Sequence, residues 1–177
     1  MAYIKSVKGT TPTMGKGCFL ADNATLTGDV VMGDDCSVWF NAVVRGDVHS
    51  IRIGHNVNIQ DGAIIHCTYQ KAPVTIGNNV SIAHHAIIHG CTIHDNVLIG
   101  MGAIVMDGAV IHSNSIVGAG AVVTEGTVVG SGEVWAGLPA RKVKDIDPAL
   151  LEGQVNRISR NYNMYAGWYD PEVKVEE

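Results

Sequence analysis

The sequence predicts a mainly β protein, a three-sided parallel β-helix of six-residue repeats followed by one C-terminal α-helix. Aliphatic residues recur every six positions, without a break, from Ile93 to Val129. Turn-forming residues such as Gly77-Asn78-Asn79 fall between the aliphatic positions, and only 6% of the 177 residues are aromatic. A six-residue period does not match the period of an α-helix. The repeats also continue for many more residues than a single β-strand contains. The chain must therefore turn a corner every few residues and stack coil on coil around a narrow interior.

The same period runs through the earlier part of the chain in blocks, which begin at Leu20, Ile53 and Ile76. Three joins depart from it, with steps of nine from Val44 to Ile53, eleven from Ile65 to Ile76, and five from Ile88 to Ile93. We interpret the first two as surface loops over residues 47–52 and 67–73, because outward loops leave the stack undisturbed. The third is a tight corner at residues 90–92.

The repeat ends near residue 140, which divides the chain into a β-helix domain, residues 1–140, and a segment of linker, helix and tail, residues 141–177. Asp147-Pro148 is typical of a helix start, with Asp as the N-cap and Pro in the first turn. Apolar residues then follow at steps of three or four up to about residue 167, which predicts a helix packed on the solenoid. We expect residues 171–177 to fray. The stripe consists of Leu151, Val155, Ile158, Tyr162 and Tyr165.

The composition of the chain argues against some classes of binding partner. The formal charge of −5 at pH 7 and the lack of any Lys/Arg run argue against nucleic acid and against an anionic membrane surface. No apolar stretch approaches a membrane span, and residues 1–16 lack the apolar core of a signal peptide. The four cysteines are widely spaced and form no Cys-x-x-Cys pair. We therefore expect free thiols and a soluble, cytoplasmic protein.

Stacking three six-residue repeats per coil places Arg45, His66 and His89 in one outward column. His66 and His89 then lie on adjacent coils, about 4.8 Å apart, close enough to share a divalent metal. His84 and His85 lie in a different column, with Asp61 one coil below. Either could complete the site only from a neighbouring subunit around a three-fold axis. The register alone does not choose between His84 and His85.

Several motifs together resemble the γ-class carbonic anhydrase family, and most closely its short bacterial hexapeptide-repeat members. The resemblance covers nearly the whole chain. It implies a left-handed parallel β-helix, a homotrimer, and a zinc ion, in some members iron, at each subunit interface. The motifs are Val44-Arg45-Gly46-Asp47, Asn58-Ile59-Gln60-Asp61-Gly62, His66, Ala83-His84 and Ile88-His89-Gly90.

The resemblance also implies the metal ligands, which are His66 and His89 of one subunit and His84 of the next. It thereby selects His84 over His85. The implied reaction is the reversible hydration of carbon dioxide to bicarbonate by a metal-bound hydroxide. Three neutral imidazoles leave the ion its charge, which can lower the pKa of bound water from 15.7 to about 7.

The family assigns further roles around the metal. Arg45 and Asp61 are implied to pair across the subunit contact, and Asp47 to belong to the same polar network. Gln60 is implied to lie near the metal-bound solvent, and Tyr162 to be the active-site tyrosine. These five are the candidate catalytic residues.

The chain departs from the best-characterised active members at two places. Val48 stands where they carry a glutamate, and residues 67–73 contain no carboxylate where they carry a proton-shuttling glutamate. Metal binding is therefore better supported than rapid turnover, and a catalytically weak trimeric metal-binding scaffold is one alternative. A second alternative is a hexapeptide-type acyltransferase or thioesterase acting on acyl-CoA. The same solenoid carries such enzymes, and Ala136-Gly137-Leu138-Pro139-Ala140-Arg141 resembles one of their segments.

Overall fold

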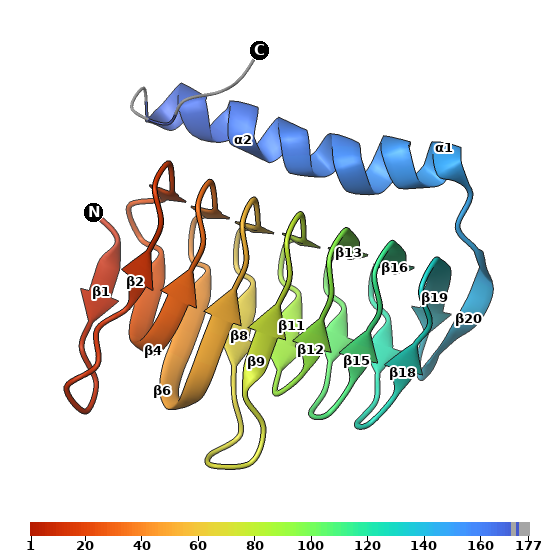
Figure 1. The fold of residues 1–177 in the computed structure, drawn as a ribbon, viewed down its shortest axis with the longest axis horizontal. Helices are drawn as coiled ribbons and strands as arrows, with labels where there is room; N and C mark the ends of the chain where they lie inside the picture. The colour runs from red at the N-terminus through yellow and green to blue at the C-terminus, as the bar shows by residue number, and fades with distance from the viewer. Residues whose placement is uncertain (171–172, 174–177) are drawn as a thin grey trace.

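The computed structural model describes residues 1–170 and 173, and it confirms a parallel β-solenoid with one helical segment along its side (Figure 1). Its short strands stack coil on coil into three faces, which we call A, B and C. The A face contains β1 (Tyr3–Lys5), β8 (Ile64–His66), β11 (Ile87–His89), β14 (Ile104–Val105), β17 (Val122–Val123) and the first parts of β4 (Thr25–Met32) and β6 (Val43–Ile53).

The B face follows the A face around the next corner, and the C face completes each coil. The B face contains β2 (Thr13–Met14), β9 (Val74–Ile76), β12 (Thr92–Ile93), β15 (Val110–Ile111), β18 (Val128–Val129) and the second parts of β4 and β6. The C face contains β3 (Phe19–Leu20), β5 (Ser37–Val38), β7 (Asn58–Ile59), β10 (Ser81–Ile82), β13 (Val97–Ile99), β16 (Ser115–Val117) and β19 (Glu133–Gly137).

The core is the interior of this prism, and its register is the one that the six-residue period predicts. On the A face, Val44, Ile65, Ile88 and Val105 pair in one inward column and are fully buried. Each such side chain contributes about 1.5–3 kcal/mol by burial, so a shift in register would be costly on every coil at once. Small residues fill the corners, where two faces meet: Ala42, Ala63, Ala86, Ala103 and Ala121 are all buried.

Asparagines form the corner between the B and C faces. Asn79, Asn96 and Asn114 have φ of 54°, 57° and 60°, in the left-handed region that Asn tolerates better than most residues. Their side-chain amides also bond from coil to coil, from Asn56 to Asn79 at 2.7 Å, then to Asn96 at 3.1 Å and to Asn114 at 3.2 Å. The predicted turn residues thus serve both the backbone bend and the stacking.

The two predicted loops differ from each other. Residues 47–52 are not a loop, because β6 continues unbroken from Val43 to Ile53 and carries its extra residues around the A/B corner. Residues 67–73 do form a loop, closed by an antiparallel bridge between Thr68 and Ala72, and it projects from the stack between β8 and β9 (the yellow loop in Figure 1).

The helix begins as predicted and covers the C face. The Asp147 side chain accepts a hydrogen bond from the Leu150 backbone N–H at 2.7 Å. The segment runs through α1 (Pro148–Leu150), a π-helical turn η1 (Leu151–Asn156) and α2 (Arg157–Tyr169). Val155 packs against Leu98 and Ile116, which point outward from the C face. Among residues 1–170 and 173, no helix has the length and apolarity that crossing a membrane requires.

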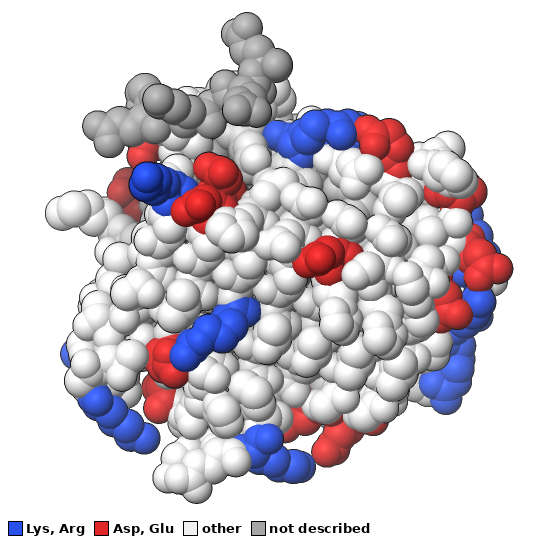
Figure 2. Space-filling model, viewed as in Figure 1, with Lys and Arg blue, Asp and Glu red and all other residues white. Residues whose placement is uncertain are grey.

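One strand in the segment expected as a linker was not predicted. β20 (Ala140–Asp145) turns back and pairs antiparallel with β19, which covers the open edge of the C-face sheet. The tail expected from residue 171 lies, apart from Val173, outside the described residues. On the face drawn in Figure 2, Lys and Arg side chains lie singly or beside Asp and Glu, with largely uncharged surface between them.

Candidate metal centre

The predicted histidine pair is present on adjacent coils. β8 and β11 pair in parallel with His66 directly opposite His89, at the A/B corner. His66 Nδ1 lies 3.2 Å from His89 Nε2. Two nitrogens bound to one tetrahedral zinc ion, with Zn–N bonds of 2.0–2.1 Å, are about 3.3 Å apart. The spacing of the pair therefore matches the spacing of two zinc ligands.

The second nitrogen of each ring faces a carboxylate. His66 Nε2 lies 3.2 Å from Asp47 Oδ1, and His89 Nδ1 lies 2.5 Å from Asp107 Oδ1. A carboxylate only accepts, so each of these ring nitrogens carries the hydrogen when the imidazole is neutral. The remaining nitrogens, His66 Nδ1 and His89 Nε2, then both present lone pairs, and these face each other. A cation between the rings would bind both lone pairs, as a metal ion does in carboxylate–histidine–metal chains.

The carboxylates are held in place by further bonds. Asp47 Oδ2 accepts from Arg45 at 2.7 Å, and Asp107 Oδ2 accepts from the Thr68 hydroxyl at 2.5 Å. Partial burial acts to raise the pKa of each aspartate, but hydrogen bonds from Arg45 and His66 to Asp47, and from Thr68 and His89 to Asp107, outweigh it. Both pKa values lie below the ordinary range, so both groups are anionic near neutral pH.

His66 is itself suited to metal binding. Burial lowers its pKa, and the hydrogen bond to Asp47 only partly offsets this. The positive charge of Arg45 lowers the pKa further. The ring is therefore neutral at physiological pH, the form in which imidazole is a ligand.

Asp107 is a site residue that the sequence analysis did not identify. It directly follows Met106, which the register places in the column of His66 and His89. A carboxylate one position after that column, on the coil next to His89, was the available signal. The short bond from His89 to Asp107 makes it a positioning residue for that ring.

His84 follows β10 at the corner between the C and A faces, and its column is therefore different from that of His66 and His89, as the register predicts. Its Nδ1 lies 2.9 Å from Asp61 Oδ2, and its Nε2 lies 3.2 Å from the Tyr162 hydroxyl. Four residues of corner and strand, residues 85–88, separate it from His89 along the chain. Among residues 1–170 and 173, no three His, Cys, Asp or Glu side chains converge to hold an ion. One chain thus brings two of the three predicted ligands together.

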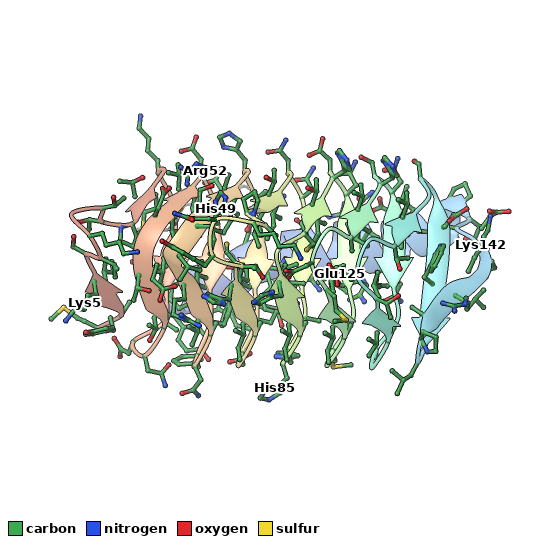
Figure 3. All side chains as sticks on the ribbon, turned by 90° about the horizontal axis from the view of Figure 1, so that it is seen from below. Lys5, His49, Arg52, His85, Glu125 and Lys142 are labelled. Carbon is green, nitrogen blue, oxygen red and sulfur yellow. The ribbon has the colours of Figure 1, made fainter. Side chains whose placement is uncertain are left out.

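His85 has a different role from His84. Its φ of 57° is left-handed, and it takes the corner position that Gly62 and Gly102 take one coil before and after it. Figure 3 shows the ring at the edge of the solenoid, pointing away from its body. The geometry of the corner therefore points to His84 as the inward-bonded member of the pair.

The remaining predicted residues divide between the two edges. Gln60 is buried, donates to Asn58 at 2.9 Å and accepts the backbone N–H of His84 at 3.2 Å, so it belongs to the His84 edge. Tyr162 lies there too, and burial, with the nearby Asp61 charge, raises its pKa to about 12. Within one chain Arg45 pairs with Asp47, while Asp61 lies on the opposite edge.

Known proteins resemble this chain in sequence. The family profile described as bacterial transferase hexapeptide (six repeats) matches residues 11–46 and 90–125. A carbonic anhydrase of Geobacillus kaustophilus is 42% identical over 155 residues, which cover 88% of this chain and 84% of that protein. Gamma carbonic anhydrase 1, a mitochondrial protein of Arabidopsis thaliana, is 40% identical over 92% of this chain and 60% of its own length.

A solved structure shares the whole fold. It is a Bacillus cereus protein whose name assigns it provisionally to the acetyltransferases. It superposes with a TM-score of 0.92 at 34% identity, covering 95% of this chain and 96% of that chain. High identity over most of the length, the repeat profile and the histidine pair lead to one conclusion. The chain belongs to the γ-class carbonic anhydrase-like family of hexapeptide-repeat proteins.

Proposed function

We propose that three copies of the chain assemble around a three-fold axis and that each interface holds one zinc ion, or iron, between His66 and His89 of one subunit and His84 of the next. The proposed reaction is the reversible hydration of carbon dioxide to bicarbonate. The observation that carries the proposal is the pair of ring nitrogens, His66 Nδ1 and His89 Nε2, whose lone pairs face each other at 3.2 Å.

The surface between the two edges supports the assembly. One outward column of the A face is apolar, and Ile64 within it is 41% exposed in the single chain. A continuous apolar column on a solvent-facing sheet marks an interaction surface. A three-fold axis facing the A face brings the His66/His89 edge of one subunit to the His84 edge of the next. The column consists of Val43, Ile64, Ile87, Ile104 and Val122.

The side chains at both edges fit the proposed chemistry. When bound, zinc would supply Lewis-acid activation of a water molecule at neutral pH. Asp47 and Asp107 fix the tautomers of His66 and His89, so that both rings offer lone pairs to the ion. Asp61 does the same for His84, because a bond from Nδ1 to the carboxylate leaves the lone pair on Nε2. That lone pair faces the Tyr162 hydroxyl in the single chain and would be offered to the metal of the neighbouring site in the trimer.

Tyr162 and Gln60 act at the His84 edge. The Tyr162 hydroxyl touches His84 Nε2, and its pKa of about 12 keeps it protonated at neutral pH. Tyr162 therefore orients groups beside the metal and does not carry away the proton. Gln60 anchors the His84 backbone and positions the ligand.

The test of the proposal is stopped-flow hydration of carbon dioxide by the zinc-loaded protein, with zinc-treated His89→Ala as the control. We expect catalysis by the natural chain and a rate at the uncatalysed background in the variant. A natural chain no faster than the variant overturns the enzymatic proposal, and retained zinc in that case supports the scaffold alternative.

Acyl transfer or thioester hydrolysis is the second candidate, favoured by the repeat profile and by the name of the Bacillus cereus structure. These enzymes need a histidine base and no metal. Release of free CoA from acetyl-CoA, undiminished by a chelator and by His89→Ala, would favour this candidate over the metal-dependent reaction. The four cysteines are free thiols, which supports a cytoplasmic location for either activity.

A further inference from the structure

Two of the three interruptions of the six-residue repeat, residues 47–52 and 67–73, line one pocket together with the N-terminal turn. The pocket has a volume of about 510 Å³ and lies beside Asp47, on the B-face side of the A/B corner. Its walls come from the N-terminal turn, from the extra residues of β6 and from the 67–73 loop, three segments that the stack itself does not need. Figure 3 shows His49 and Arg52 from the β6 corner on the same part of the solenoid. The polar lining includes Lys8, Thr10, His49, Arg52, Tyr69 and Gln70.

Two of the three walls are tight turns with their own backbone bonds, and the third is the strand β6. The N-terminal turn is closed by an antiparallel bridge between Val7 and Thr10, and Lys8 at its tip has a φ of 52°. The 67–73 loop is closed in the same way, and Gln70 at its tip also has a φ of 52°. Lys8 Nζ lies 5.5 Å from the centre of the Tyr69 ring, which joins the two turns. The pocket is therefore preformed.

Among the described residues, one positively charged side chain of the pocket lining has no carboxylate partner. Asp29 is paired with Arg52 at 2.7 Å, and Asp47 is paired with Arg45 at 2.7 Å. Within residues 1–170 and 173, Lys8 contacts the Tyr69 ring and has no ion pair. The negative charges of the lining are thus neutralised internally, and the charge available to a ligand is positive.

The other free groups include hydrogen-bond donors. The Ser50 backbone N–H donates to His49 Nδ1 at 2.8 Å, so the neutral ring carries its hydrogen on Nε2 and can donate there. Thr10, Tyr69 and Gln70 add hydroxyl and amide donors. An ammonium and an imidazole N–H in one concavity favour an anionic ligand.

We propose that this pocket binds a small organic carboxylate with a short apolar body. The volume lies in the range of sites for organic molecules, about 300–1,000 Å³, and far exceeds what carbon dioxide or bicarbonate fills. Val7, Val48 and the Tyr69 ring supply apolar wall for the body of the ligand, and Lys8 and His49 supply contacts for its carboxylate. The site is separate from the metal centre, although Asp47 lines the pocket and also contacts His66.

The test uses benzoate as the probe and isothermal titration of the full chain, both zinc-loaded and treated with a chelator. The variant is Lys8→Gln, with Lys8→Arg to restore the charge and Lys5→Gln as the matched control on β1 outside the pocket. We expect a Kd on the order of 1 mM, weakened about tenfold in Lys8→Gln and unchanged in the other two variants. Thermal melting of each variant checks that it folds.

Four outcomes overturn the proposal, three with benzoate and one with a second probe. One is no binding by the natural chain, and another is equal binding by natural chain and Lys8→Gln. The third is binding lost on chelation, which would place the carboxylate on the metal. Inorganic phosphate is the second probe, and competition as effective as that of benzoate would replace the organic carboxylate with a plain anion. None of these results depends on carbon dioxide hydration, so this inference and the proposed function fail separately.

Discussion

His66 Nδ1 and His89 Nε2 face each other at 3.2 Å across two neighbouring coils, while Asp47 and Asp107 hold the opposite nitrogens of the same rings. The relationship follows from the register, because residues in one column of a solenoid recur at the spacing of paired strands. A metal site of this kind depends on the carboxylates as well as on the histidines.

Asp107→Asn tests that dependence. The amide can no longer fix the ring with an anionic acceptor, so His89 loses its preferred tautomer and orientation. We expect zinc affinity to fall about 10–100-fold, as for other partners of metal-binding histidines. A competition titration against a chromophoric chelator measures it. Glu125→Gln, on the neighbouring coil and in an exposed pair with Lys71, is the control. Equal affinity in both variants would show that Asp107 does not position the ligand.

Ile64→Glu tests the assembly. It places three carboxylates near the proposed three-fold axis, where burial of a charge is costly. We expect sedimentation to give a trimer for the natural chain and a monomer for this variant. Val128→Glu, on the B face with 55% of its surface exposed, is the matched control and should remain a trimer. Loss of the trimer in both variants, or in neither, would place the interface elsewhere.

The hydrogen bonds of Glu133 lead us to expect that the stability of the folded chain depends on pH. Hydrogen bonds from Lys142 and Trp135 lower its pKa, and burial offsets this only in part. Because the folded pKa is depressed, the stabilisation is present above the unfolded pKa, about 4.3, and is lost as the pH falls through the folded pKa. Urea unfolding at fixed protein concentration should show Glu133→Gln less stable by about 1 kcal/mol at pH 7. At pH 3 the difference should shrink, and a constant difference would contradict the assignment.

Two substitutions of Asn79 measure how much the asparagine corner contributes to the stability of the fold. Asn79→Gly loses the amide bonds to Asn56 and Asn96 but accommodates the φ of 54°. Asn79→Ala loses the same bonds and must also adopt a left-handed conformation, which costs roughly 1 kcal/mol more. We expect Ala to be the more destabilising in thermal unfolding. A glycine variant as unstable as the alanine variant would mean that backbone strain contributes nothing there.

The sequence predicted the solenoid well because every coil repeats the same burial pattern. The pairing of Val44, Ile65 and Ile88 follows from spacing alone, and so do the positions of His66 and His89 beside that column. Asp147 also predicted the start of the helix, because the N-cap hydrogen bond joins residues only three positions apart in the sequence.

Features that depend on contacts outside the repeat were not predictable in this way. β20 has no six-residue period and forms because β19 leaves an open sheet edge. β6 pairs with β4 on both sides of a bulge, up to Gly46 and again from Ile51, which a step of nine residues does not reveal. Asp107 differs from these, because its place one position after the histidine column was available from the register, although Met106 occupies the column itself. The pocket at Lys8 requires three such irregular segments to meet.

Subunit complementation tests the shared metal site most directly. His84→Ala keeps the pair at one edge, and His89→Ala keeps the ligand at the other, so neither homotrimer has an intact site. An equal mixture, unfolded and reassembled together, should recover about one quarter of the natural zinc content, because three quarters of the random trimers contain one intact interface. Zinc content after gel filtration is the measurement. Full zinc binding by His84→Ala alone, or no recovery in the mixture, would contradict a site built from two subunits.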